Sequence, residues 1–235
     1  MAGASSIGRI TFLETNKITY FKMLKNHRVR IAVMVGTVGV IFMFFYESIL
    51  TEHLVNIGIG KSETGYFFGL VSFVYTLSSL LIGYLCHFIK RRYLTQFSLL
   101  LSALALFCLG PSKLLNFPET SYSLTIIGIS ILGLSAAGIF VPLLSEIIEA
   151  MQLEAIIGDN CPELTDKASG LFNAAYASGC IAAPLIGAAL NEKWGFSTTC
   201  DVLALSALLC SAIYFAVGVF PEWCKKDDQK ITIIE

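Results

Sequence analysis

The stretch GYFFGLVSFVYTLSSLLIGYLCHFIKRR, residues 65–92, decides the fold class. Residues 65–89 contain no Asp, Glu, Lys or Arg, and about 20 mostly apolar residues suffice for a helix to cross a bilayer. Lys90, Arg91 and Arg92 then follow together, as is typical of a span that ends at the cytosolic surface. The stretch predicts a transmembrane helix and raises the question of what three adjacent cations do at its end.

The rest of the chain has the same composition. Hydrophobic residues make up 55% of the 235 residues, charged residues 14%, and the mean hydropathy is +0.73, whereas a soluble domain of this size would need more polar surface. The apolar runs long enough to span a membrane are about 30–50, 65–89, 94–110, 122–148, 168–190 and 198–220. We therefore expect an all-α membrane protein with six transmembrane helices in a domain at 30–220, between a basic N-terminal segment at 1–29 and a tail at 221–235.

Lys and Arg are divided unequally between the two sides of this arrangement. Alternating assignment puts thirteen of the 16 on the side of the termini and leaves Lys61, Lys113 and Lys193 on the other. Because Lys and Arg concentrate on the cytosolic side, both termini are predicted to be cytosolic, whether the membrane is that of an organelle, a vesicle or the cell. The longest connection, 149–167, falls on the same side and is predicted to be a solvated acidic loop.

Several functional classes fit the sequence poorly. A net charge of −1 gives no basis for a nucleic-acid partner. The seven cysteines are odd in number and show no CxxC spacing, so they predict packing residues and neither a metal site nor a cofactor. Ser135 lies in a small-residue segment, but His27, His53 and His87 fall at or outside helix ends, where none is placed to act as its base. We expect no enzyme.

One face of the span at 65–89 is polar. Its hydroxyl side chains follow the spacing i, i+3, i+4 and i+7, which puts them on one side of a helix: Ser72, Tyr75, Thr76 and Ser79. A polar face at this depth is expected to meet water, substrate or another helix. Ordinary helix packing through small hydroxyl residues is the alternative.

Other polar groups within the spans complete the predicted set of substrate and proton contacts: Glu47, Glu146, Asn173 and Tyr176. An ionisable group inside a spanning helix is a functional-site hypothesis by default. For each glutamate the alternative is a position close enough to the interface to be solvated.

Two segments resemble motifs of the major facilitator superfamily of transporters. GYLCHFIKRR is similar to the loop signature Gly-x-x-x-Asp-Arg-x-Gly-Arg-Arg, in which Gly83, Arg91 and Arg92 match, while His87 replaces the Asp and Lys90 replaces the second Gly. The resemblance implies that this loop grips neighbouring helix ends on the cytosolic side and helps to hold one state of a gate.

The second segment, SGLFNAAYASGCIAAPLIG, resembles the Gly-x-x-x-Gly-Pro-x-x-Gly-Gly pattern of proton antiporters. Gly179, Pro184 and Gly187 match, and Ala183 and Ala188 stand in place of glycines. Small residues allow close helix packing, and a proline within the helix removes a backbone donor and forms a flexing point.

Over residues 18–221 the chain resembles the C-terminal six-helix half of such a transporter, most closely in the vesicular amine and polyamine branch. The resemblance implies proton-coupled exchange of a small organic cation in the bilayer, with substrate bound between this half and a second six-helix half. Three readings stay open: a fragment of a longer transporter, a half-transporter that dimerises, or a scaffold or regulatory subunit that does not transport.

Overall fold

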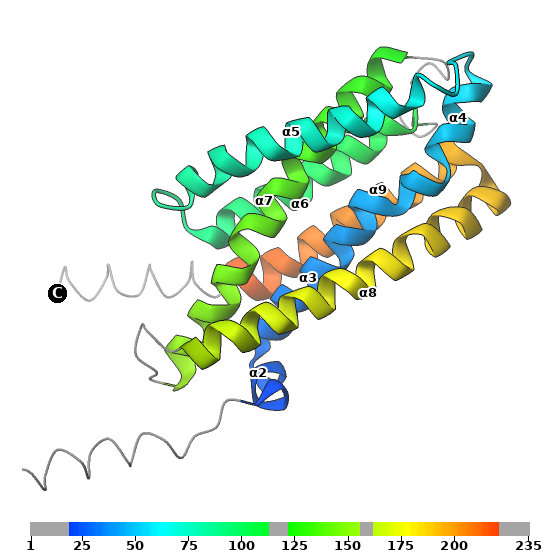
Figure 1. The fold of residues 1–235 in the computed structure, drawn as a ribbon. Coiled ribbons are helices and arrows are strands. Elements are labelled where there is room, and N and C mark those ends of the chain that lie inside the picture. Colours follow the sequence, from blue (N-terminus) through cyan, green and yellow to red (C-terminus); the bar gives the residue numbers. More distant parts are fainter. Residues whose placement is uncertain (1–18, 113–121, 156–161, 221–235) are drawn as a thin grey trace, which may run out of the picture.

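The computed structural model describes residues 19–112, 122–155 and 162–220, and in this part of the chain helices are joined by short turns, with no strand (Figure 1). Most of the predicted N-terminal segment and the whole predicted tail lie outside the described residues. The helices are α2 (Tyr20–Lys25), α3 (His27–Phe44), the 3₁₀ turn η1 (Phe45–Ser48), α4 (Leu50–Asn56), α5 (Thr64–Leu85), α6 (Arg91–Leu109), α7 (Tyr122–Ala155), α8 (Pro162–Trp194), α9 (Phe196–Tyr214) and the π-helical turn η2 (Phe215–Val219).

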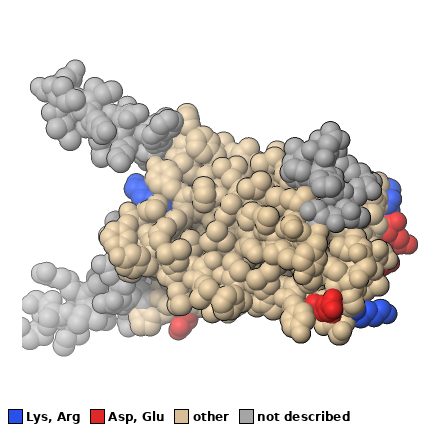
Figure 2. Space-filling view, turned by 90° about the horizontal axis from the view of Figure 1, so that it is seen from above, with Lys and Arg blue, Asp and Glu red and all other residues tan. Residues whose placement is uncertain are grey.

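Six segments are long and apolar enough to cross a membrane, each overlapping one predicted run. They are His27–Ser48, Thr64–Leu85, Arg91–Leu109, Tyr122–Leu153, Pro162–Trp194 and Phe196–Val219. In the face that Figure 2 shows, charged side chains gather toward the two ends of the molecule and the middle is uncharged. This distribution is that of an integral, multi-pass membrane protein.

The helices form one bundle in which α7 is central. α7 packs along α5, α6 and α3, α6 also packs along α9, and α3 packs along α8 (Figure 1). α3, α6 and α7 are the more buried spans, whereas α5 and α8 bury the least of their surface. The two helices with the most exposed surface therefore flank the α3–α7 pair.

Three boundaries differ from those predicted. α6 begins at Arg91 and not near Leu94, so Arg91 and Arg92 belong to its first turn. The first span is interrupted at η1, where the Phe45 backbone closely approaches α8 at Gly187.

The third boundary concerns the predicted loop at 149–167. α7 continues through Pro142 to Ala155, and α8 begins at Pro162. Glu149 is therefore a helical residue, and the prediction that it lies in a solvated loop is wrong. The buried side chains of Ala150 and Met151, together with the partners of Glu149 described below, support the extra turns.

Candidate functional site

A cluster of five charged side chains joins three spans at one end of the bundle. Glu146 of α7 is 8% exposed and accepts two hydrogen bonds on Oε1, from Arg28 Nη2 of α3 at 3.1 Å and from Arg92 Nε of α6 at 2.8 Å. Two guanidinium groups thus share one buried carboxylate. Opposite charges and hydrogen bonds of this kind offset the cost of removing a carboxylate from water.

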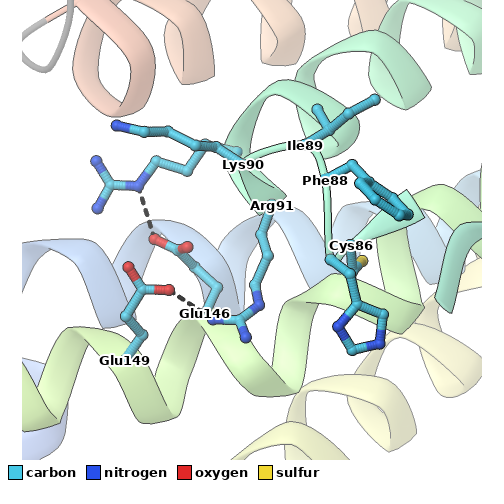
Figure 3. Close-up of a pocket in the computed structure, with 9 residues that line it drawn as sticks. Cys86, Phe88, Ile89, Lys90, Arg91, Glu146 and Glu149 are labelled. Carbon is cyan, nitrogen blue, oxygen red and sulfur yellow. Dashed lines mark hydrogen bonds and ion pairs between the residues drawn. The ribbon is translucent and has the colours of Figure 1, made fainter. Parts of the chain in front are cut away.

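Glu149 lies one helical turn beyond Glu146 on the same face of α7. Arg91 Nη1 donates to Glu149 Oε2 at 2.6 Å, and Arg28 Nη2 lies 3.8 Å from Glu149 Oε1. This pair is more exposed than the first, with 37% and 41% of the two side chains accessible. Arg28, Arg91, Arg92, Glu146 and Glu149 together are called the charge cluster below. Figure 3 shows Arg91, Glu146 and Glu149 of this cluster.

Local structure explains why these residues meet. Asn26 caps α3, accepting on Oδ1 from the Arg28 backbone N–H at 2.8 Å, and its Nδ2 donates to the Ala150 carbonyl of α7 at 3.1 Å. Two arginines at the start of α6 are unfavourable beside the positive end of the helix dipole. The carboxylates of Glu146 and Glu149 offset that repulsion.

The charge cluster also reaches the end of the last span. Arg92 Nη1 donates to the Gly218 carbonyl at 3.0 Å, and Gly218 lies in the π-helical turn η2. A π turn displaces a carbonyl from the regular helical pattern and is frequent at functional sites. The cluster thus connects α3, α6, α7 and η2 at one end of the bundle.

A pocket of about 290 Å³ opens beside the charge cluster and is lined by residues 86–92 together with Glu146 and Glu149 (Figure 3). His87 and Lys90, two of the positions that depart from the loop signature, lie in its exposed turn. Gly83 is one turn earlier on α5, and no atom lies within 4 Å of the position of an added Cβ. Burial raises the pKa of the Cys86 thiol while Arg91 opposes that shift, so the thiol stays protonated at neutral pH.

The predicted polar face of α5 is present and largely accessible. Ser72 and Thr76 are exposed and Tyr75 and Ser79 are half-buried. The Ser72, Thr76 and Ser79 hydroxyls each donate to a backbone carbonyl three or four residues earlier, at 2.8 to 3.1 Å. Each hydroxyl oxygen still has lone pairs with which it can accept a further hydrogen bond.

The polar residues of α8 lie toward the same side of the bundle. Asn173 is exposed and Tyr176 is half-buried, and the Tyr176 ring packs edge-on against Phe44 of α3 and Phe140 of α7, at centroid distances of 6.0 and 5.8 Å. Tyr75 and Tyr176 pack on the same apolar cluster. Tyr176 also lies close enough to Tyr75 and Glu47 to interact with both electrostatically.

The two candidate glutamates are far apart. Arg28, which pairs with Glu146, starts the span in which Glu47 lies near the other end. At a rise of about 1.5 Å per residue this separation is roughly 28 Å. One small ligand therefore cannot contact both carboxylates in this conformation, and the predicted set divides into a tyrosine site with exposed Glu47 and a charge cluster with Glu146.

The small-residue motif of α8 faces α3 and η1. Gly179, Ala183 and Gly187 are buried; a Cβ on Gly179 would lie 2.6 Å from Val40 Cβ, and one on Gly187 would overlap the Phe45 carbonyl. Pro184 lies inside the helix, and its carbonyl is 3.5 Å from the Ser48 hydroxyl that donates to it. Close approach at these positions explains why side chains are small there.

Sequence reasoning missed Arg28 and Glu149 as members of the charge cluster. The signal available was the i, i+3 spacing of Glu146 and Glu149, which puts two acids on one helix face. In the part of the chain that the structure describes, no three His, Cys, Asp or Glu side chains gather as they would around a metal ion.

Comparison with known protein families gives one match. A family model described as Major Facilitator Superfamily matches residues 31–232. Together with the six spans, this match confirms the predicted fold class and the predictions that the chain is a membrane transporter protein and not an enzyme. A comparison with curated proteins finds no match.

Proposed function

The chain belongs to the major facilitator superfamily, and from this premise we propose that it exchanges a small organic cation, an amine or a polyamine, for protons. The observation that carries the proposal is that Tyr75 and Tyr176 pack on the same apolar cluster at the accessible side of α5 and α8, with Glu47 within electrostatic range of Tyr176. A carboxylate beside aromatic faces suits an ammonium group, because it supplies a counter-charge and the rings supply cation–π contact.

The proposed substrate site is open on one side and requires a second protein surface to enclose it. α5 and α8 expose polar side chains along spans in which lipid cannot satisfy hydrogen bonds. We propose that a second six-helix half covers this face, as a second copy of this chain or as an N-terminal half, with the present residues forming a C-terminal half. Substrate would bind between the two halves and reach either side as one half rocks against the other.

The charge cluster would act as the gate of this half. Arg91 and Arg92 connect α6 to the two glutamates of α7, and Arg28 connects α3 to the same carboxylates. Exchange of these partners would let the helix ends separate. By the excess of Lys and Arg on this side, the cluster and both termini face the cytosol.

Transport by the purified chain in proteoliposomes tests the proposal. We expect uptake of mono- or polyamines under an imposed pH gradient, abolished by a protonophore. Glu47→Gln should reduce uptake at least tenfold and Tyr176→Phe severalfold. Glu163→Gln, the same substitution at an exposed carboxylate paired with Lys167 at 2.6 Å, should leave uptake unchanged. Uptake by Glu47→Gln equal to that of the parent would contradict the proposed cation site.

A membrane scaffold without transport is the second candidate. It is favoured by His87, which stands where the loop signature has an Asp and is exposed in the turn between α5 and α6. This candidate predicts no flux for any amine and a stable complex with a different membrane protein after gentle extraction. A complex with a second copy of the chain together with flux would exclude it.

A further inference from the structure

At the end of the bundle opposite the charge cluster, a histidine stacks on the start of the last span. The His53 ring of α4 lies 4.0 Å from the Phe196 ring, centroid to centroid, with an angle of 14° between the planes. Phe196 is the first residue of α9. The two rings thus form a flat contact between α4 and α9, elements far apart in the sequence.

The surroundings of this ring suit the neutral imidazole only. His53 Nε2 is buried and has no hydrogen-bond partner among the described residues, so a proton added there would carry charge into a site without an acceptor. The ring also lies beside the N-terminal turn of α9, where unpaired N–H groups carry partial positive charge. Burial accordingly lowers the pKa of His53.

A pocket beside the ring offers a protonated imidazole a different environment. It has a volume of about 250 Å³ and is lined by Ile49, Glu52, His53, Asn56, Asn191, Gly195 and Phe196. The Glu52 carboxylate and the two amide oxygens can accept hydrogen bonds from an imidazolium. Among the described lining residues, Glu52 is the one titratable group besides His53, and those from α8 and α9 are uncharged.

We propose that His53 is a proton-binding site that controls the α4–α9 contact. In the neutral state the ring stacks on Phe196 and holds α4 against the start of α9. On protonation the ring leaves the stack and turns into the pocket, where the Glu52 carboxylate and the amide oxygens of Asn56 and Asn191 accept hydrogen bonds from it. Under the proposed orientation this site faces the non-cytosolic compartment, so that acidification there would loosen this end of the bundle.

The sign of the pH dependence follows from the lowered pKa. Because His53 binds its proton less tightly in the folded protein than in the unfolded chain, the contact contributes its full stability above about pH 6.5. That stability is lost as the pH falls through the lower pKa of the folded state. The test depends on the ring and its helix contact, so its outcome is independent of whether the chain transports an amine.

Nuclear magnetic resonance of the full chain in micelles, with ¹³C-labelled histidine, measures the titration directly. The chain has three histidines, and the resonance absent from His53→Gln identifies His53. We expect the midpoint of the His53 titration to lie below pH 6.5. The midpoint should be lower still in Glu52→Gln and should move back toward pH 6.5 in Phe196→Leu. A His53 midpoint at or above 6.5 overturns the proposal.

Fluorescence of Trp194, two residues before Phe196, tests the movement. The chain has two tryptophans, so the Trp223→Phe background leaves Trp194 as the reporter. Its emission should change with the same midpoint as the His53 resonance. His53→Phe keeps a ring that can stack but cannot titrate, and it should abolish this change while preserving the melting temperature at pH 7.5. A pH response that persists in His53→Phe contradicts the proposal.

Discussion

The two ends of the bundle are held together by different interactions. At the charge-cluster end, Arg28, Arg92 and Glu146 connect α3, α6 and α7 through one partly buried and one buried hydrogen bond between opposite charges. At the other end, backbone approach joins α8 to η1 at Gly187, and an aromatic stack joins α4 to α9. Neither contact at this second end uses a pair of opposite charges.

This difference indicates where the helices can exchange partners. An ion-pair cluster has alternative arrangements of similar geometry, because each carboxylate can accept from more than one guanidinium. A close-packed backbone contact has no second arrangement without a shift of the helix itself. The charge-cluster end is therefore suited to switching, and the Gly187 contact to acting as a fixed point.

Removing the shared carboxylate should have the largest effect on stability. Glu146→Gln leaves Arg28 and the buried Arg92 without the carboxylate to which both donate, and breaking a buried ion pair by removing one partner costs about 3–5 kcal/mol. Thermal unfolding in detergent measures this loss. Glu146→Asp, which keeps the charge, should restore part of the stability. If the free energy of unfolding of Glu146→Gln is within about 1 kcal/mol of that of the parent, the charge cluster does not stabilise this end of the bundle.

Filling the closest backbone approach should have the next largest effect. A Cβ at Gly187 would meet the Phe45 carbonyl, and because a backbone oxygen cannot turn aside as a side chain can, Gly187→Ala should destabilise by about 1–3 kcal/mol. Gly65→Ala is the matched control, because nothing lies within 4 Å of its Cβ position. Equal melting temperatures for the two variants would mean that α8 is free to move relative to η1.

The contrast also shows what the sequence can reveal. Six spans were predictable because runs such as 65–89 lack charged residues entirely, and burial of backbone polar groups in lipid permits little besides helix. Gly179, Ala183 and Gly187 were recognisable as a packing face from their spacing of four.

The partners of Arg91 and Arg92 were not predictable in the same way. Their carboxylates come from α7, more than fifty residues later, and only the packing of α6 on α7 decides that they meet. The sequence predicts a loop at Glu149 because local patterns do not contain the tertiary contacts that set the ends of helices. The stack of His53 on Phe196 is likewise a product of chain topology.

The outer pair of the charge cluster should contribute less than the inner pair. Glu149 and Arg91 are 41% and 37% exposed, and exposed pairs contribute roughly 0.2–1 kcal/mol. Since Arg28 also approaches Glu149, Glu149→Gln should cost about 1 kcal/mol at low salt and less at 1 M salt, where screening is stronger. A loss equal to that of Glu146→Gln would show that burial does not distinguish the two glutamates.

The smallest effect concerns the exposed face of α5 and tests the proposed second half. Gly69 is exposed, and no atom lies within 4 Å of the position of an added Cβ. In the single chain, Gly69→Ala should therefore stabilise α5 by about 0.5 kcal/mol, because alanine is the better helix former.

A partner packed closely on that face changes the expectation for the same variant. Small residues let membrane helices approach each other, and Gly69 lies one turn before Ser72 and two before Thr76 on the polar face, so an added methyl would weaken docking there. Crosslinking in the native membrane separates the cases when the parent and Gly69→Ala are compared, with Gly65→Ala as the control. A higher melting temperature with fewer crosslinked pairs in Gly69→Ala alone would assign this face to the second half. A higher melting temperature with unchanged crosslinking would place Gly69 against lipid and move the proposed contact toward α8.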